Sequence, residues 1–341
     1  MGLSLPKGHS WWPDELRLTS TEDCIDAYAN KRLAGAMPDP EALEELEASP
    51  YCLDADSVLH SLGMADSGKG LLNAAPYKAL LSLDSGAYTE RQTTGDCVSH
   101  GNRNAVDVSR ACEIVIKGEL ELWIARGATE PIYGARGHGG QGANCQTLAN
   151  WVCTKGGLLV RKNYPELDLD LSKYDSSIGS RWGSRGVPEA VRAEAAKTPC
   201  RYLARIKTWE EARDFAANGY GIFWCAGIAY SGSRDENGVA KLTNGSWAHS
   251  QHNCMIFDDS EWAHEKYGEA LFGIAQSWGT GFASGGWNAE RYGPAHGSVS
   301  LLRVSVLTRV IRSGWVAAIG DFQGFKKQAD KLKDFGAGTY L

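Results

Sequence analysis

The residue best suited to nucleophilic chemistry in this sequence is Cys97, in the run Gly95-Asp96-Cys97-Val98-Ser99. Apolar residues follow it at spacings near three and four, which predicts an amphipathic helix that stops at Gly118. These apolar positions are Val98, Ala105, Val108, Cys112 and Val115. A thiolate in the first turn of a helix is stabilised by unpaired backbone N–H groups and by the helix dipole. We therefore expect Cys97 to be a nucleophile and not merely a core cysteine.

A base for this thiol is expected in the run Ser246-Trp247-Ala248-His249-Ser250-Gln251-His252, which leads into a predicted strand over 253–257. The Trp-x-His pattern favours His249, whereas counting back from the strand favours His252. Side chains alternate along a strand, so positions three apart face opposite ways and only one of the two can meet Cys97. We expect His249 to be the base, with His252 as the alternative base, and the other to be structural.

Amide side chains flank these residues. Gln276, in Gln276-Ser277-Trp278-Gly279, is expected to hold the imidazole in one tautomer, while Trp278 shields that hydrogen bond from water. Gln92 lies five residues before Cys97 and could donate to an oxyanion beside the backbone N–H of Cys97. Asn288 is a second candidate for the orienting amide. Together these groups favour attack on an amide carbonyl through a thioester intermediate.

Two of these segments resemble the papain family of cysteine peptidases. Gln92 with Gly95-Asp96-Cys97 resembles its Q…GSC segment, and 276–281, Gln-Ser-Trp-Gly-Thr-Gly, resembles its NSWGTG segment. Between them, 139–143 and 162–165 are similar to the family's CxGG…YP stretch, so the likeness covers about 90–310 in the same order. The runs Gly-Asp-Cys-Val-Ser and Gly-Ser-Trp-Ala-His are more narrowly similar to papain-like proteins of tailed bacteriophages.

This resemblance implies a cysteine-type endopeptidase that needs no organic cofactor and no metal. Its partners would be a protein or peptide substrate and other virion proteins. The substrate cleft would be lined by Gly139, Gly140 and Trp278. Two departures from the family leave alternatives open, because Gln276 replaces an asparagine and Gln92 is one residue closer to the cysteine than usual. The chain could be a catalytically weak or inactive structural module of a phage particle, or an amidase or acyl transferase acting on cell-wall peptides.

The predicted elements run from helices in the first half to antiparallel strands in the second, which indicates an α+β fold. By the resemblance this is a papain-like two-lobed fold, with a helical lobe over 86–205 that carries the nucleophile and a β-rich lobe over 206–316 that carries the histidine and amide. Residues 1–85 are expected to be an N-terminal extension, either a pro-segment or a docking segment. Residues 317–341 are expected to form a C-terminal amphipathic helical tail.

The formal net charge is −6 and the pI about 5.8, so we expect no attraction to nucleic acid or to anionic membranes. No signal peptide is recognisable at the N-terminus, which predicts a cytoplasmic location in a host cell or association with a virion. The sequence has nine cysteines and no CxxC pair, and most are expected to be reduced. The cysteines expected in the core are Cys112, Cys145, Cys153, Cys200, Cys225 and Cys254.

Four further features are expected to have no part in the catalytic chemistry. Asp96 is expected to be a solvated turn carboxylate, His100 to lie at the edge of the cleft, and His138 to be a loop histidine without a role. The acidic residues of 166–175 are expected to lie in a solvated loop, with calcium binding as the alternative.

Overall fold

The computed structural model describes residues 36–37, 40–49, 51–117, 126–198, 200, 202–227, 230–242, 248–313 and 315–320. Helices and strands are mixed throughout this part of the chain, which confirms the predicted α+β class. The helical tail predicted over 317–341 is wrong for residues 317–320, which belong to the strand Trp315–Gly320. The rest of that tail, from 321 onward, lies outside the described residues, as do residues 1–35, Gly118 and Trp247. No helix in the described ranges is long and apolar enough to cross a membrane.

The helices are α2 (Pro40–Glu47), α3 (Ala55–Ser61), α4 (Ala75–Leu83), α5 (Cys97–Lys117), α6 (Glu130–Gly134), α7 (Cys145–Asn150), α8 (Ser176–Arg185), α9 (Glu189–Ala195), α10 (Trp209–Ala217), α11 (Glu261–Tyr267), α12 (Ala289–Tyr292) and α13 (Val304–Ser313), with a π-turn at Trp151–Lys155 and a 3-10 turn at Pro165–Leu167. The strands are β1 (Ala36–Met37), β2 (Cys52–Asp54), β3 (Leu72–Asn73), β4 (Ala143–Asn144), β5 (Asn163–Tyr164), β6 (Leu169–Asp170), β7 (Tyr202–Arg205), β8 (Gly221–Gly227), β9 (Tyr230–Arg234), β10 (Ala240–Leu242), β11 (Ala248–Asp258), β12 (Leu271–Ala275), β13 (Ser284–Gly285), β14 (Val299–Arg303) and β15 (Trp315–Gly320).

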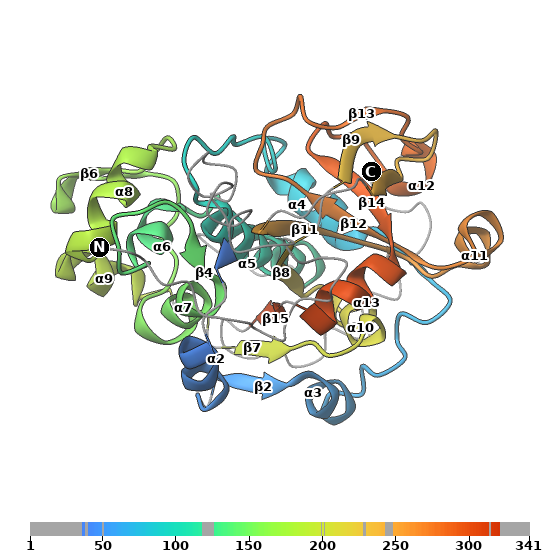
Figure 1. Cartoon of the computed structure of the whole chain (residues 1–341), viewed down its shortest axis with the longest axis horizontal. Coiled ribbons are helices and arrows are strands. Elements are labelled where there is room, and N and C mark those ends of the chain that lie inside the picture. Colours follow the sequence, from blue (N-terminus) through green and yellow to red (C-terminus); the bar gives the residue numbers. More distant parts are fainter. Residues whose placement is uncertain are drawn as a thin grey trace, which may run out of the picture.

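Eight strands form one large sheet in the order β14-β12-β11-β8-β15-β7-β2, with β3 also paired to β11. The pairings from β14 to β7 are antiparallel, and β2 joins β7 in parallel. In Figure 1 the helices α6, α7, α8 and α9 gather on one side of the long helix α5, whereas β9, β12, β13 and β14 lie on the other. Strand β7 lies on the N-terminal side of the lobe boundary expected at 205, yet it belongs to the large sheet.

The two faces of β8 contribute to two different apolar cores. Ile222 and Trp224 belong to the core shared with β12 and β14, while Phe223 and Cys225 belong to the core that contains Cys97. This separation follows from the alternation of side chains along a strand. Strand β8 therefore lies between the two apolar cores and contributes side chains to both.

Helix α5 runs over the Phe223 and Cys225 face of β8. A Cβ atom added at Gly221, which is on that same face, would lie 1.8 Å from the backbone oxygen of Ala105. The contact is possible only because glycine has no side chain there. Ser109 fixes the helix further, because its hydroxyl donates to Ile319 O at 2.6 Å and accepts from the N–H of Gly221 at 2.8 Å.

The part of the N-terminal extension that the structure describes pairs and packs with the rest of the chain. Strands β2 and β3 belong to the large sheet, and Tyr77 of α4 is fully buried. The backbone N–H groups of Asp66 and Gly68 donate to Asp214 at 2.7 and 3.1 Å, and that of Gly70 donates to Asp259 at 2.9 Å. Both of these side chains are buried, so the glycine-rich run 63–70 is held by hydrogen bonds to acidic side chains of the second half of the chain.

Candidate active site

Cys97 is the first residue of α5, and its side chain is completely buried. The preceding turn is closed by backbone hydrogen bonds from Ser99 N to Asp96 O at 2.9 Å and from Asp96 N to Thr94 O at 2.9 Å. The sulfur therefore lies at the end of the helix where the backbone N–H groups point outward and the dipole is positive.

Gln92 and Ser277 are joined by two hydrogen bonds. The backbone N–H of Gln92 donates to the carbonyl oxygen of Ser277 at 2.7 Å, and the Ser277 hydroxyl donates to the carboxamide oxygen of Gln92. The Gln92 carboxamide nitrogen donates to Thr94 O at 2.8 Å. A carboxamide nitrogen has two N–H donors, so this bond uses one of them and the other can serve an oxyanion. Two motifs that are distant in the sequence thus meet at the loop that precedes Cys97.

Gln276 directly follows β12 and is buried, with its backbone N–H donating to Ser298 O at 2.8 Å. Trp278 packs edge-on against Phe282, with ring centroids 4.7 Å apart. The residue just before Gln276 is Ala275, which is the β12 partner of His252. The backbone of the predicted orienting amide is therefore next to one of the two candidate bases.

Both candidate bases lie on β11, where the structure describes their backbone and not their side chains. His252 pairs with Phe223 of β8, and His249 pairs with Ala226. Directly opposite residues of an antiparallel pair share a face of the sheet. Position 252 is therefore on the face that Phe223 turns toward α5, and position 249 is on the opposite face, together with Trp224.

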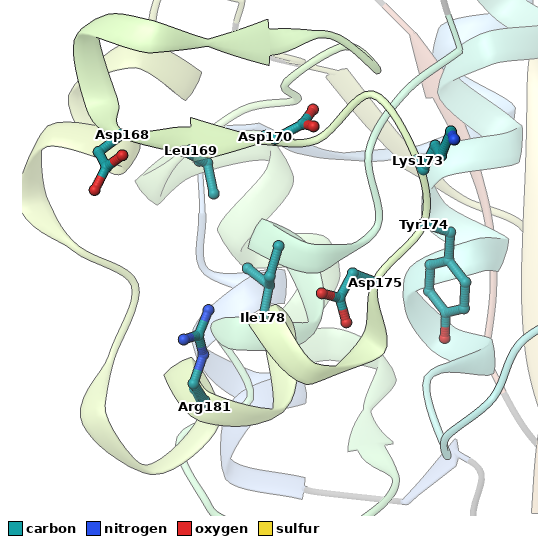
Figure 2. A pocket seen from close by; sticks show the side chains of 8 residues that line it. All are labelled: Asp168, Leu169, Asp170, Lys173, Tyr174, Asp175, Ile178 and Arg181. Carbon is teal, nitrogen blue, oxygen red and sulfur yellow. The ribbon is translucent and has the colours of Figure 1, made fainter.

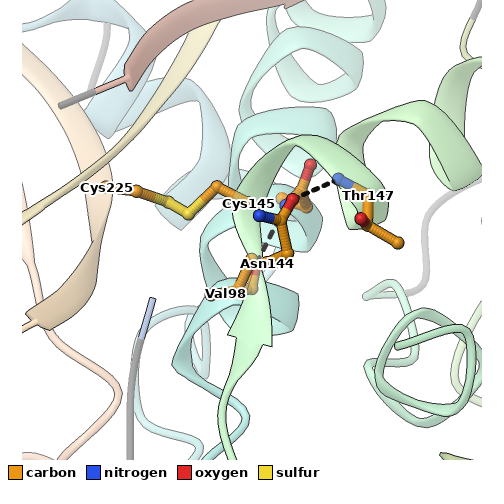
Figure 3. The surroundings of a disulfide bond; sticks show 6 residues. Val98, Asn144, Cys145, Thr147 and Cys225 are labelled. Atoms are coloured by element: carbon orange, nitrogen blue, oxygen red, sulfur yellow. Dashed lines mark hydrogen bonds between the residues drawn. A yellow bond between two sulfur atoms is a disulfide. The ribbon is translucent and has the colours of Figure 1, made fainter. Parts of the chain in front are cut away.

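Cys145 and Cys225 form a disulfide, with Cα atoms 6.5 Å apart and a sequence separation of 80. The bond links the start of α7 to β8, and Figure 3 shows it beside Val98 of α5. The prediction that these two cysteines are reduced core thiols is thus wrong. Cys97, Cys112, Cys153 and Cys200 are buried thiols, and Cys52 is a partly buried one.

Asp96 is buried and not solvated, which corrects the prediction. Its Oδ2 accepts a hydrogen bond from the Tyr174 hydroxyl at 2.7 Å, while its Oδ1 has no hydrogen-bond partner. Burial, and then the charge of Asp96, raise the pKa of Tyr174. His100 is also buried, with Nε2 3.6 Å from Asp96 Oδ2.

A buried ionic network lies directly behind these residues. Glu90 is 3.3 Å from Arg103 and 2.8 Å from Arg161, and Arg161 also contacts Glu130 at 2.6 Å. Burial alone would raise the pKa of Glu90, but the charges of Arg103, His100 and Arg161 outweigh it and lower the pKa to about 2. Glu90 is therefore ionised at neutral pH and holds the start of α5 against 126–161.

The glycine loop lies against the nucleophile turn. The N–H of Gly142 donates to Gly95 O at 3.1 Å, and the Arg136 guanidinium donates to Gly140 O at 2.9 Å. Gly139 lies close to Ser184 of α8. The pKa of His138 is lowered by burial and then by the charge of Arg136.

Asn288 and the acidic stretch have structural explanations. The Asn288 side chain accepts from Arg291 N at 3.1 Å and so caps α12. Asp175 caps α8 in the same way through Ser177 N, and Asp168 and Asp170 are exposed. Within the described ranges, no group of three or more histidine, cysteine or acidic side chains could hold a metal ion.

Sequence reasoning did not assign three residues that this site uses. Ser277 lies in the run Gln276-Ser277-Trp278-Gly279, which predicts no role for its hydroxyl, and no sequence pattern indicates Tyr174 or Arg136. The aromatic and basic character of the last two gave no local signal. Their partners, Asp96 and Gly140, are reached only through the tertiary fold.

Three solved structures of cysteine proteases are similar to this chain. Xylellain, a cysteine protease from Xylella fastidiosa, gives a TM-score of 0.49 at 12% identity and covers 85% of this chain and 96% of its own. Procathepsin B S9 from Trypanosoma congolense gives 0.42 at 12% identity, with coverages of 86% and 88%. Digestive procathepsin L 3 from the larval midgut of Tenebrio molitor gives 0.35 at 10% identity, with coverages of 87% and 98%.

None of these three similar structures is a phage protein. No protein-family model and no curated protein matches the sequence. With TM-scores below 0.5, the similarity carries no argument about chemistry, and the function proposed below is argued from the site residues.

Proposed function

We propose that this chain is a cysteine peptidase in which Cys97 attacks the carbonyl of a peptide bond. The observation that carries the proposal is the pair of hydrogen bonds between Gln92 and Ser277. These bonds bring the loop before the nucleophile against the segment that supplies Gln276. A thiol at a helix start, an amide donor and an orienting amide are the groups that thioester chemistry requires.

The strand register supports His252 as the base of this proposal. Position 252 shares a face with Phe223 and Cys225, and that face is turned toward α5 at Gly221. Its neighbour Gln276 follows the β12 partner of His252. His249, which the Trp-x-His pattern favoured, is the alternative base. Its register partner on β8 is Ala226, which is on the opposite face of that strand from Phe223 and Cys225.

In the proposed reaction the imidazole accepts the Cys97 proton, and the thiolate attacks the substrate carbonyl carbon. The backbone N–H of Cys97 and the carboxamide of Gln92 donate to the oxyanion. The imidazolium then protonates the leaving amine, and water hydrolyses the thioester. Gln276 orients the imidazole, and none of these steps calls on a cofactor.

The substrate is a protein or peptide chain. The hydrogen bond between Gly142 and Gly95 brings the glycine loop to the nucleophile turn, which supports Gly139 and Gly140 as substrate contacts along with Trp278. The Cys145–Cys225 disulfide favours an oxidising setting over a reducing cytoplasm, because disulfides persist mainly outside the cytosol. Attachment to the outside of a virion would meet this condition.

Residues 51–85 are proposed to be a permanent part of the enzyme and not a removable pro-segment. They supply β2 and β3 to the large sheet, and α4 buries Tyr77 and Leu80. Asp84 also makes a two-fold ion pair with Arg126, at 2.8 and 3.0 Å. Removing this segment would expose the apolar side chains that it covers and leave the edges of β7 and β11 without their partner strands.

Incubation with peptide libraries tests the proposed activity. We expect the folded protein to cleave peptides, and the Cys97→Ala variant to show no cleavage while unfolding at the same temperature. Full activity in the variant would contradict the proposal. If the protein hydrolyses amide bonds only in cell-wall peptides, it is an amidase that acts on that substrate. If it cleaves no substrate at all, it is a structural module.

A further inference from the structure

A cavity of about 380 Å³ lies in the helical half, lined by 168–170, 173–175, Ile178 and Arg181. Its floor is apolar, because two of the residues that line it, Leu169 and Ile178, have hydrocarbon side chains. Both are largely buried. Figure 2 shows these two side chains pointing toward each other across the open space. A volume of this size accommodates one amino-acid side chain with its flanking backbone.

The rim of the cavity is charged, with a surplus of carboxylates. Asp168, Asp170 and Asp175 face one lysine, Lys173, and one arginine, Arg181. Hydrogen bonds from Ser172 and Ser177 lower the pKa values of Asp170 and Asp175, so both are ionised at neutral pH. The rim therefore complements a ligand that is cationic on balance.

One wall of the cavity is shared with the candidate active site. Tyr174 lines the cavity, and its hydroxyl donates to Asp96 and accepts from the N–H of Thr93 at 3.2 Å. Ser176, the first residue of α8, accepts a hydrogen bond from the Thr93 hydroxyl at 2.7 Å. The cavity wall is thus bonded to the turn that carries Cys97.

We propose that this cavity is an accessory site for a segment of the polypeptide substrate in which an apolar side chain lies next to basic ones. The apolar side chain fills the space between Leu169 and Ile178, and the neighbouring cations meet the carboxylates of the rim. The proposal rests on the proposed peptidase function for the source of the peptide. Occupancy of the site anchors the substrate through residues remote from its scissile bond.

Fluorescence polarisation with the full-length Cys97→Ser variant tests this without any turnover. The probe is fluorescein-labelled Gly-Lys-Leu-Lys-Gly, with Gly-Glu-Leu-Glu-Gly and Gly-Lys-Ser-Lys-Gly as matched peptides. We expect the first to bind measurably, and each of the other two to bind at least about five-fold more weakly. Equal binding of the acidic peptide, or no binding of the basic one at millimolar concentration, would overturn the proposal.

A second variant locates the binding. Asp168 has φ +49°, a left-handed conformation that asparagine also adopts readily, so Asp168→Asn removes the charge without backbone strain. We expect it to weaken the basic peptide about two- to five-fold. Glu261→Gln, on the distant helix α11 (Figure 1), is the control and is expected to have no effect. An unchanged Kd in Asp168→Asn contradicts the site.

Failure of the accessory site can be told apart from failure of the enzyme. If the peptide binds through Asp168 but wild-type protein cleaves nothing, the binding site stands and the peptidase proposal is lost. If short substrates are cleaved but the peptide does not bind, the peptidase stands and the accessory site is lost.

Discussion

The backbone N–H of Gln92 donates to the carbonyl of Ser277, and the Ser277 hydroxyl donates back to the side chain of Gln92, across 185 residues of sequence. This reciprocal contact fixes the carboxamide that would stabilise an oxyanion. It also ties the loop before Cys97 to the end of β12. The side chain of Ser277 thus acts on the proposed chemistry through Gln92.

Removing the Ser277 hydroxyl tests that relationship. In Ser277→Ala the Gln92 carboxamide loses one of the two hydrogen bonds that orient it, which corresponds to about 1 kcal/mol and so to a roughly five-fold loss in kcat/KM. The loss should fall on kcat, because the oxyanion forms only in the transition state. Steady-state kinetics with a fluorogenic peptide measure it. Ser305→Ala, which removes a hydroxyl that donates to the remote Glu269, serves as the control, and an equal loss there would argue against a specific role.

The buried network behind α5 predicts a pH-dependent stability. Glu90→Gln leaves Arg103 and Arg161 without their shared carboxylate, which should lower the free energy of unfolding by about 3 to 5 kcal/mol at pH 7. The pKa of Glu90 is lowered to about 2, so its contribution is present above its unfolded pKa, near 4.5, and is lost as the pH falls toward 2.

Urea denaturation at intervals from pH 7 to pH 2.5 checks this. The difference between wild type and Glu90→Gln should stay constant down to about pH 4.5 and then shrink. A difference that is unchanged, or that grows as the pH falls, would show that Glu90 is not ionised in this network.

Pairing of Cys145 with Cys225 predicts a stability that depends on redox conditions. The bond closes a loop of 80 residues, so the double substitution to serine should lower the free energy of unfolding by about 2 to 4 kcal/mol. Non-reducing mass spectrometry after alkylation of the unfolded chain should find both cysteines unmodified. Alkylation of both in unreduced protein would contradict the pairing.

A chain that begins at residue 86 should not fold. It lacks β2, β3 and α4, whose buried residues complete the core around α5 and β11. Circular dichroism melting is expected to show no cooperative transition, whereas the full chain unfolds cooperatively. A stable and active fragment would mean that residues 51–85 are a dispensable pro-segment after all.

Local patterns in the sequence were enough for part of this structure. The apolar stripe after Cys97 predicted α5, and the strand predicted over 253–257 lies within β11. Each of these signals is a periodicity within one segment. The glycine before the cysteine and the Gln-Ser-Trp-Gly run likewise marked the segments that the fold brings together.

Other features depend on partners far away in the chain, and no local pattern reveals them. Asp96 looks like a turn residue until Tyr174, 78 residues later, donates to it. The cysteines of the disulfide lack a recognisable spacing because the fold alone brings them together. The proposed preference for His252 over His249 rests on the register of β11 against β8, which a pattern of one strand cannot supply.

The rate at which iodoacetamide alkylates Cys97 in folded protein at pH 6 tests the central claim most directly. If Cys97 and His252 form a thiolate–imidazolium pair, wild type and His249→Ala should react rapidly at this pH, whereas His252→Ala should react at least about ten-fold more slowly. Peptide cleavage should follow the same order. Slow alkylation in wild type, or an unchanged rate in His252→Ala, would contradict the account.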